Sequence, residues 1–135
     1  MRLLIDANIL LDVLQNRAPY VTASAAIWKF CETGQAEGTV SSLTFANLVY
    51  IMRKELDPIG IEDVLRKLSL IFMFEDLTSA DLLAAAQLQW NDFEDALQSV
   101  TAERMRADYI VTRNVRDFSG SGIVAVTPEE LLNRL

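Results

Sequence analysis

Residues 2–12 read RLLIDANILLD, and this stretch decides the fold. The short, mostly apolar run from Arg2 to Ile5 stops abruptly at Asp6, which is typical of a buried strand with a polar group at its carboxyl end. After Asp6 the apolar residues recur at helical spacing, so a helix is expected to follow at once. A strand that passes straight into a helix is the first unit of an α/β domain.

Short apolar segments and helical stripes alternate along the rest of the chain. Further strands are expected at residues 38–40, 70–74, 109–112 and 123–126, and further helices at 19–34, 43–54, 61–68, 78–90, 92–106 and from 127 onward. This alternation predicts a three-layer α/β/α domain in which helices cover both faces of a mostly parallel central sheet. No internal repeat, low-complexity tract or linker interrupts it, so residues 1–135 are expected to form a single domain.

The chain contains no histidine and a single cysteine, Cys31. Their scarcity excludes Ser-His-Asp and Cys-His catalysis, imidazole acid–base chemistry, the usual zinc ligands and an internal disulfide. We interpret Cys31 as a small buried hydrophobic residue. Catalysis would have to use carboxylates, hydroxyls, amides and a few basic groups, and clustered carboxylates suit a hard cation such as Mg²⁺ or Mn²⁺.

The formal net charge of −7 argues against a bulk electrostatic grip on nucleic acid. A bound divalent ion would offset this charge, and so would a local basic rim built from the pairs Arg53–Lys54 and Arg113 with Arg116. No apolar run reaches the roughly 20 residues that cross a bilayer, and an acid as early as Asp6 argues against a signal peptide. A cytoplasmic protein without a membrane partner is therefore expected.

Two of the predicted strands end in polar clusters. The first strand leads into Asp6 and Asn8, and the strand at 109–112 leads into Asn114 and then Asp117. In open parallel sheets, sites form beyond the carboxyl ends of the strands, where the strand order reverses. If the two strands are neighbours, Asp6 and Asp117 approach each other closely enough to share a metal ion.

Each acid also has a structural alternative. Asp6 can cap the helix that follows it, and Asp117 can be a turn residue. Asp92 is a good helix N-cap, with Asp95 at the position of a capping-box partner. Asp12 is expected on the solvated face of the first helix. One by one the acids are weak indicators, and their order along the chain carries the hypothesis.

Three segments, taken together and in this order, resemble the PIN domain family. They are residues 3–12 (LLIDANILLD), 95–98 (DALQ) and 109–118 (YIVTRNVRDF). The likeness covers essentially the whole chain and is to the VapC-like bacterial branch, many of whose members are toxins of toxin–antitoxin pairs. It implies a single PIN domain that cleaves RNA phosphodiester bonds with Mg²⁺ or Mn²⁺.

Carried over position by position, the resemblance assigns Asp6 to the family's first acid and Asp95 to its third. The second acid, normally a glutamate, falls on Asn47. The fourth falls on Asn114, while Asp117, which is also commonly acidic in the family, is retained. We hypothesise that the three aspartates hold one or two Mg²⁺ or Mn²⁺ ions, directly or through water, with the two asparagines as neutral ligands.

The two asparagines are departures from the family pattern. An amide oxygen can bind a metal ion but brings no negative charge, so Mg²⁺ should bind more weakly. Asp92 and Glu94 lie within one helical turn of Asp95 and can compensate. The alternative for Asn47 is a helix residue bonded to nearby backbone.

Three further residues are given supporting roles. Thr112 is expected to orient Asp6 through a hydrogen bond, and Arg113 and Arg116 to contact substrate phosphates, the alternative being two surface arginines. The second hypothesis is a catalytically weakened PIN-fold module that binds nucleic acid or a protein partner. An antitoxin partner and a homodimer follow from the resemblance, and the apolar helices at 43–54 and 61–70 form either such an interface or part of the core.

Overall fold

In the computed structural model, which describes residues 1–135, five strands form one sheet in the order β3-β2-β1-β4-β5. Every neighbouring pair is parallel, which confirms the predicted parallel sheet. The strands are β1 (Arg2–Ile5), β2 (Glu37–Ser41), β3 (Met73–Glu75), β4 (Tyr109–Val111) and β5 (Ala125–Val126). The strand order reverses at β1, where the chain leaves β2 and β3 on one side and places β4 and β5 on the other.

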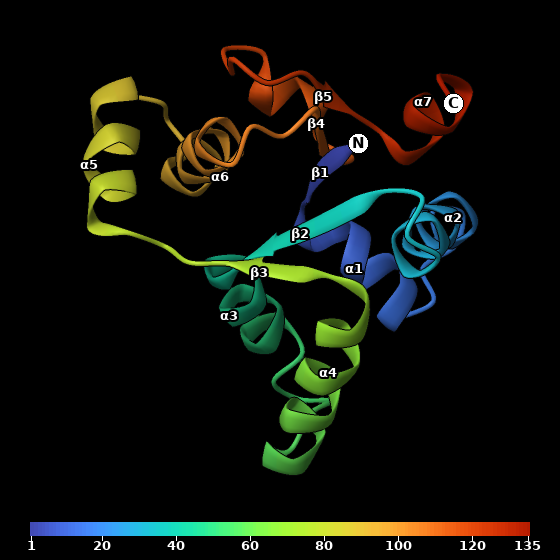
Figure 1. Cartoon of the computed structure of the whole chain (residues 1–135). Coiled ribbons are helices and arrows are strands. Elements are labelled where there is room, and N and C mark those ends of the chain that lie inside the picture. Colours follow the sequence, from blue (N-terminus) through green and yellow to red (C-terminus); the bar gives the residue numbers. More distant parts are fainter.

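Helices cover both faces of the sheet, as predicted (Figure 1). They are α1 (Ala7–Leu14), α2 (Val21–Glu32), α3 (Ser42–Ile51), α4 (Pro58–Ile71), α5 (Ser79–Leu88), α6 (Phe93–Arg104) and α7 (Pro128–Asn133), with a 3₁₀ helix η1 at Val115–Phe118. Figure 1 shows α5 and α6 together on one side of the sheet and α1, α3 and α4 on the other. The fold is therefore a three-layer α/β/α domain. No helix is both long and apolar enough to span a membrane.

The central strand β1 separates two hydrophobic clusters. Leu3, Leu4 and Ile5 are fully buried, and because successive side chains of a strand point to opposite faces, they divide between the two layers. Leu3 and Ile5 pack with residues of α1 to α4 and α7, whereas Leu4 packs with Ala102 of α6 and Phe118 of η1. Burial on both faces is why this strand is apolar without interruption up to Asp6.

The carboxyl ends of the strands carry the residues that start the next helices. Asp6 caps α1, and Ser41, the last residue of β2, caps α3 by accepting a hydrogen bond from the Leu43 backbone N–H at 3.2 Å. Thr127 follows β5 and begins α7 with a capping box. These short connections place the first turns of α1, α3 and α7 on the same side of the molecule, at the carboxyl ends of the parallel strands.

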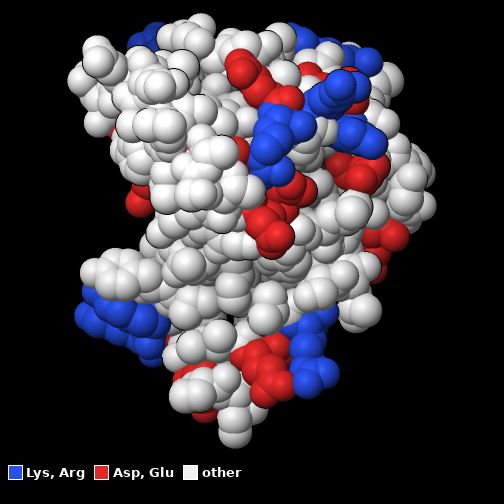
Figure 2. Space-filling model, turned by 60° about the vertical axis from the view of Figure 1, so that its left-hand side comes forward, with Lys and Arg blue, Asp and Glu red and all other residues white.

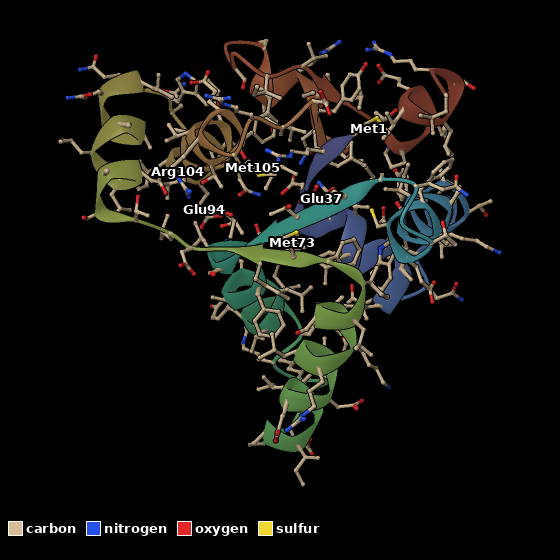
Figure 3. All side chains as sticks on the ribbon, in the orientation of Figure 1. Met1, Glu37, Met73, Glu94, Arg104 and Met105 are labelled. Carbon is tan, nitrogen blue, oxygen red and sulfur yellow. The ribbon has the colours of Figure 1, made fainter.

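Helix α6 is fixed at its far end by Arg104. The guanidinium donates to the buried carboxylate of Asp81 at 2.9 Å and to the carbonyl of Asp76 at 2.8 Å, and it also pairs with Glu75 at the end of β3. Figure 3 shows Arg104 on the side of α6 that faces α5 and β3. This anchor ties α6 to two neighbouring elements, so the position of its first turn is set by the frame of the fold.

Two predictions from the sequence are wrong, and several helices end earlier than predicted. Residues 70–74 were predicted to be a strand, but residues 70 and 71 belong to the end of α4, and β3 begins only at Met73. Leu70 lies on the outer side of α4 and is 87% exposed. A short apolar run fits the helical period as well as the strand period. Here the apolar stripe of α4 continues into the run, so its first residues are helical. Helices α2, α3, α5 and α6 are each shorter by a few residues than predicted.

Asp12 is the second correction. It was expected in solvent, but its side chain is fully buried and accepts a hydrogen bond from the Ser24 hydroxyl at 2.9 Å. An ion pair at 3.2 Å joins it to Arg113. Asp12 faces inward because α2 covers this side of α1 and supplies the polar partner that a buried carboxylate requires.

A glycine in β2 tests how tightly the core is packed. A Cβ atom at Gly38 would lie 2.5 Å from the Cys31 Sγ and 2.8 Å from the Phe72 ring, both in the larger hydrophobic cluster. Cys31 is buried, as predicted, and burial raises the pKa of its thiol to about 11. We predict that Gly38→Ala lowers the free energy of unfolding by about 1–3 kcal/mol in urea denaturation, since overpacking forces the core to move.

Two controls accompany this prediction. Gly120→Ala meets only an ordinary contact of 3.4 Å with Trp90 and should change stability far less. Combining Gly38→Ala with Cys31→Ala removes the Sγ atom and should recover part of the loss. Equal stability of Gly38→Ala and the unsubstituted chain would contradict the packing described here.

Candidate active site

Asp6 joins the carboxyl ends of β1 and β4. The register of the two strands pairs Ile5 with Val111, so Asp6 and Thr112 follow side by side. One carboxylate oxygen of Asp6, Oδ1, accepts from the Ala7 backbone N–H at 2.8 Å, and the other, Oδ2, accepts from the Thr112 hydroxyl at 2.7 Å. Asp6 thus caps α1, which was its structural alternative, and it is also held by Thr112 of the neighbouring chain segment, as expected from the position of Thr112 at the strand end.

Burial raises the pKa of the Asp6 carboxyl above its ordinary value. Hydrogen bonds from Thr112, from the Ala7 backbone N–H and from the Gln98 side chain counteract the rise, as does the positive charge of Arg113. A carboxylate that is partly dehydrated and held by three donors keeps a fixed orientation. It can serve as a rigid oxygen ligand at the end of β1.

Asp95 lies in the first turn of α6, where other acids surround it. The pKa of its carboxyl rises to about 7, first because of burial and then because of the negative charges of Asp92, Asp6, Asp117 and Glu94. The structure therefore brings Asp6 and Asp117 within electrostatic range of Asp95, from β1, η1 and α6. An acid that resists ionisation among like charges is a feature of functional sites and of cation sites in particular.

Asp92 is the N-cap of α6, the structural role that the sequence also allowed for it. Its Oδ1 caps α6 by accepting from the Asp95 backbone N–H at 3.1 Å, and its side chain is exposed. It lines a hollow of about 480 Å³ together with Asp95 and Asp117. Asp92 thus contributes charge beside Asp95 while one of its oxygens is occupied by the helix.

Asn47 pairs with Glu94 across the gap between α3 and α6. The Asn47 Nδ2 donates to the Glu94 Oε2 at 3.1 Å, so its amide is bonded to a side chain and not to nearby backbone. Both residues line a hollow of about 250 Å³ with Asp6 and Asp95. Figure 3 labels Glu94 in the space between α6 and the carboxyl end of β2, next to α3. A glutamate of α6 therefore stands beside Asn47, the position to which the resemblance assigns the family's second acid.

The remaining predicted site residues lie in the segment after β4, where Asn114 and Asp117 line different hollows. Asn114, Arg116 and Asp117 are exposed. The backbone N–H of Asn114 donates to the Thr112 hydroxyl at 3.0 Å, but its side chain lines a separate hollow with Arg113. Asp117 lines a hollow together with Asp95, whereas Asn114 lines a hollow that does not include Asp6.

Arg113 is engaged by the protein itself. Its guanidinium pairs with the buried Asp12 and lies over the Tyr20 ring, 4.1 Å from the ring centre. The backbone N–H of Arg113 is 3.4 Å from the Asn8 side-chain oxygen, which draws the loop toward the start of α1. Arg116, in contrast, forms no ion pair and remains the freer of the two basic side chains.

Sequence reasoning missed Gln98 and Thr44. Gln98 is buried on α6, where its Nε2 donates to the Thr44 hydroxyl at 2.9 Å, and its side chain helps to lower the pKa of Asp6. The signal in the sequence was its spacing, because a residue three positions after Asp95 lies on the same helix face. A long polar side chain on the buried side of a helix indicates a partner inside the fold.

The donor set fits a hard divalent cation in type and in charge. All the candidate ligands are oxygen atoms. The pKa of Asp95 is raised first by burial and then by the repulsion of neighbouring acids, and a cation would relieve that repulsion. No group of three or more acidic, histidine or cysteine side chains lies close enough to hold an ion directly. Mg²⁺ commonly keeps several waters and binds through one or two carboxylates, which matches this spacing.

The shifted pKa of Asp95 predicts how stability depends on pH. The unfolded carboxyl loses its proton near 3.8 and the folded one near 7, so the folded state binds more protons between these values. Stability should therefore fall as pH rises through this window. Asp95→Asn should remove that fall, making the variant more stable than the unsubstituted chain at pH 7.5 by about 1 kcal/mol at a partly exposed site.

Urea denaturation at pH 4.5, 6 and 7.5 measures this difference. Asp63→Asn is the matched control, since Asp63 is exposed on α4 and pairs only with Lys67. Its pH profile should run parallel to that of the unsubstituted chain. If the pH profile of Asp95→Asn also runs parallel to that of the unsubstituted chain, burial and the neighbouring acids do not raise the pKa of Asp95 as described.

Solved structures with the same fold include components of toxin–antitoxin systems. A toxin–antitoxin complex from Klebsiella pneumoniae is 23% identical, with a TM-score of 0.70, over 93% of this chain and 96% of that one. VapC20 of Mycobacterium tuberculosis, a sarcin–ricin loop cleaving toxin, is 13% identical with a TM-score of 0.72, over 93% and 99%. VapBC2 of Rickettsia felis, bound to a promoter DNA fragment, is 16% identical with a TM-score of 0.67, over 94% and 98%. At these identities the likeness shows the fold.

The family is shown by the sequence. A search of curated proteins gave no match, but a family model described as a PIN domain matches residues 2–116. That range contains all three segments of the predicted resemblance except the last two residues, and it includes Asp6, Asn47 and Asp95. The chain belongs to the PIN domain family, whose members are generally nucleases that use divalent metal ions.

Proposed function

We propose that this protein is a metal-dependent endoribonuclease that hydrolyses RNA phosphodiester bonds at a site built on Asp6, Asp95 and Asp117. The observation that carries the proposal is the gathering of acids around Asp95, which lines one hollow with Asp6 and another with Asp92 and Asp117. Burial and these charges together raise the pKa of its carboxyl to about 7. Such a concentration of negative charge at the carboxyl ends of β1 and β4 is costly unless a cation offsets it. The membership in a nuclease family supports the same reading.

Asp95 lies between two hollows, and each offers a place for a cation. Asp6, Asn47 and Glu94 line the first with it, and Asp92 and Asp117 line the second. One or two Mg²⁺ or Mn²⁺ ions would be held by Asp95 together with Asp6 on one side and Asp117 on the other, with waters completing the coordination. Asn47 would serve as a neutral ligand or as the group that positions Glu94.

The chemistry divides between the cation and the chain. A bound divalent ion lowers the pKa of water and offsets charge on the scissile phosphate. The chain supplies orientation: the Thr112 hydroxyl and the Ala7 backbone N–H hold Asp6, so its oxygens do not need to reorganise when substrate arrives. Arg116 is the better candidate for a phosphate contact, because Arg113 is committed to Asp12.

The overall charge limits how RNA can bind. Figure 2 shows basic and acidic side chains lying next to one another on the face drawn, with no continuous basic stripe. With a net charge of −7, binding cannot rest on many phosphate contacts. We therefore expect affinity for RNA to rise when the divalent ion is present.

The similar structures support a partner as well. Two of them are complexes of toxin–antitoxin systems, and we propose that this chain is the toxin of such a pair. Apolar side chains are exposed on α3 and α4, among them Ile51, Ile59 and Leu70. These faces would bind an antitoxin or a second copy of the chain. Light scattering during size-exclusion chromatography, with and without a co-expressed small protein encoded next to this one, tests both assemblies.

A weakened module that binds nucleic acid or a protein partner is the second candidate. It is favoured by Asn47 and Asn114, which bring no charge, and by the lack of three acids close enough to bind an ion directly. Calorimetric titration with Mn²⁺ separates the two candidates. A nuclease should bind the ion at a site that Asp95→Asn weakens, whereas a module without a metal site should show no specific binding.

The decisive assay follows the cleavage of single-stranded RNA in Mn²⁺ or Mg²⁺. Asp6→Asn and Asp95→Asn should each lower the rate at least about 100-fold, because each removes a charged ligand or its alignment. Asp63→Asn, on α4, should cleave at the unsubstituted rate. Cleavage that persists in EDTA, or in the double variant Asp6→Asn with Asp95→Asn, would contradict the proposed mechanism.

The Asn47–Glu94 pair gives a separate prediction. If Glu94 supplies the charge that Asn47 lacks, Glu94→Gln should weaken Mn²⁺ binding about tenfold. Glu62→Gln is its control, because Glu62 is exposed on α4 and pairs only with Arg66. Unchanged Mn²⁺ affinity in Glu94→Gln would leave Glu94 without a role in holding the ion.

A further inference from the structure

A buried ion pair links the turn after β4 to α1 and to the start of α2. Asp12, on α1, is fully buried, and its Oδ1 lies 3.2 Å from the Arg113 guanidinium. Its Oδ2 accepts from the hydroxyl of Ser24, which is also fully buried, at 2.9 Å. The Arg113 guanidinium also lies over the Tyr20 ring, 4.1 Å from the ring centre. Arg113 is therefore held by two other parts of the fold.

This pair is a poor source of stability. A buried ion pair stabilises a fold only when hydrogen bonds satisfy both charged groups. Here the Asp12 Oδ1 and the Arg113 Nε are buried without a hydrogen-bond partner in the chain. An apolar pair of similar volume commonly serves a core as well or better. The pair therefore needs another explanation, and its place beside the candidate site supplies one.

The backbone of Arg113 connects the two side chains that hold one oxygen of Asp6. The Asp6 Oδ2 accepts from the Thr112 hydroxyl at 2.7 Å and from the Asn8 Nδ2 at 3.4 Å. Thr112 directly precedes Arg113, whose backbone N–H donates to the Asn8 Oδ1 at 3.4 Å. The backbone N–H of Asn114, the next residue, donates to the Thr112 hydroxyl at 3.0 Å. The position of Arg113 thus sets both side-chain donors to this oxygen.

The Asn8 side chain is the weakest part of this arrangement. Both of its hydrogen bonds measure 3.4 Å, which is longer than the roughly 2.7–3.2 Å of ordinary N–H···O bonds. They therefore form only while the turn after β4 is kept close to the start of α1. The Arg113 side chain keeps it there, since it is only 25% exposed and pairs with Asp12 of the same helix.

We propose that Asp12 and Arg113 are a positioning pair, which fixes the turn after β4 and thereby the orientation of the Asp6 carboxylate. They act through the side chains of Thr112 and Asn8 and do not contact the substrate or a cation. The inference rests on the proposed function for its effect on cleavage. The orientation of Asp6 itself is measured on the protein alone, without RNA or metal.

The test replaces the ion pair by an uncharged pair of similar shape. Arg113→Gln alone leaves the Asp12 carboxylate buried without a counter-charge and should lower Tm by about 10 °C. Adding Asp12→Asn removes that charge and keeps an oxygen that accepts from Ser24, so the double variant should regain most of the lost Tm. If the pair serves stability alone, the properties of the site return with the Tm. If it positions Asp6, they remain impaired in the double variant.

Amide hydrogen exchange, followed by NMR, reports how firmly Asp6 is held. The backbone N–H of Ala7 donates to the Asp6 Oδ1, and that of Asn114 donates to the Thr112 hydroxyl. In the double variant both should exchange at least about tenfold faster than in the unsubstituted chain. The backbone N–H groups of Asp6 and Thr112 donate to carbonyls of β4 and β5, and they should keep their protection.

A second pair with a buried carboxylate provides the matched control. Arg104 donates to the buried Asp81 at 2.9 Å, at the far end of α6. Asp81→Asn with Arg104→Gln removes the same two charges there. This control should leave the exchange of Ala7 and Asn114 unchanged relative to that of the strand amides, whatever its effect on Tm.

Cleavage of single-stranded RNA in Mn²⁺ gives the kinetic readout. The double variant should lower kcat about 10–100-fold and keep KM within about twofold, because a misoriented Asp6 slows the reaction while no contact with substrate is lost. Arg116→Gln should instead raise KM, since Arg116 is the candidate for a phosphate contact.

Three results would overturn the inference. In the first, the Ala7 and Asn114 amides of the double variant stay as protected as in the unsubstituted chain. In the second, KM rises as much as kcat falls, which would make Arg113 a substrate contact. In the third, the double variant cleaves RNA at the unsubstituted rate, which would leave the proposed nuclease intact. If the unsubstituted chain cleaves no RNA, the proposed nuclease fails, and hydrogen exchange still decides whether the pair positions Asp6.

Discussion

The hydrogen bond from Thr112 to Asp6 is the contact on which the site depends. It exists because β1 and β4 are neighbours in a register that pairs Ile5 with Val111. A shift of one residue would turn Leu3, Leu4 and Ile5 to the wrong faces and would separate the two polar groups at the same time. The hydrophobic core and the candidate site are therefore specified by one pairing, and a fault in either would disturb the other.

A second layer of buried charge supports the loop after β4. Arg113 links that loop to Asp12 on α1 and to Tyr20 before α2. A buried ion pair is expensive to break, because removing one partner leaves the other charge without compensation. The loop that carries Asn114 and Asp117 is thereby tied to the same helix that Asp6 caps, so the acids from three elements share one frame.

Much of this could be predicted from the sequence, because its patterns are local. The run ending at Asp6 and the run ending at Thr112 each showed a buried strand, and alternation with helices predicted the parallel sheet. Burial of Asp12 could not be predicted, since its position fits a solvated helix face until α2 and Arg113 are placed against it. Leu70 satisfied both helix and strand periods, and only the extension of α4 decided between them. Gln98 was visible as a polar residue, but its partner Thr44 comes from a distant part of the chain.

The role of Asn47 differs between the resemblance, which treats it as the replacement of an acid, and the structure, where it is a hydrogen-bond donor. By resemblance to the family, it stands at a position where an acid is usual. In the fold its amide donates to Glu94, which lies in the first turn of α6 beside Asp95. A glutamate at position 47 would add another negative charge next to a carboxyl whose pKa already stands at about 7. An amide at this position supplies a donor where a second carboxylate would repel, and the charge is carried by α6 instead of α3. The hollow that Asn47 and Glu94 line with Asp6 and Asp95 therefore takes its negative charge from α6 and from the end of β1, and none from α3.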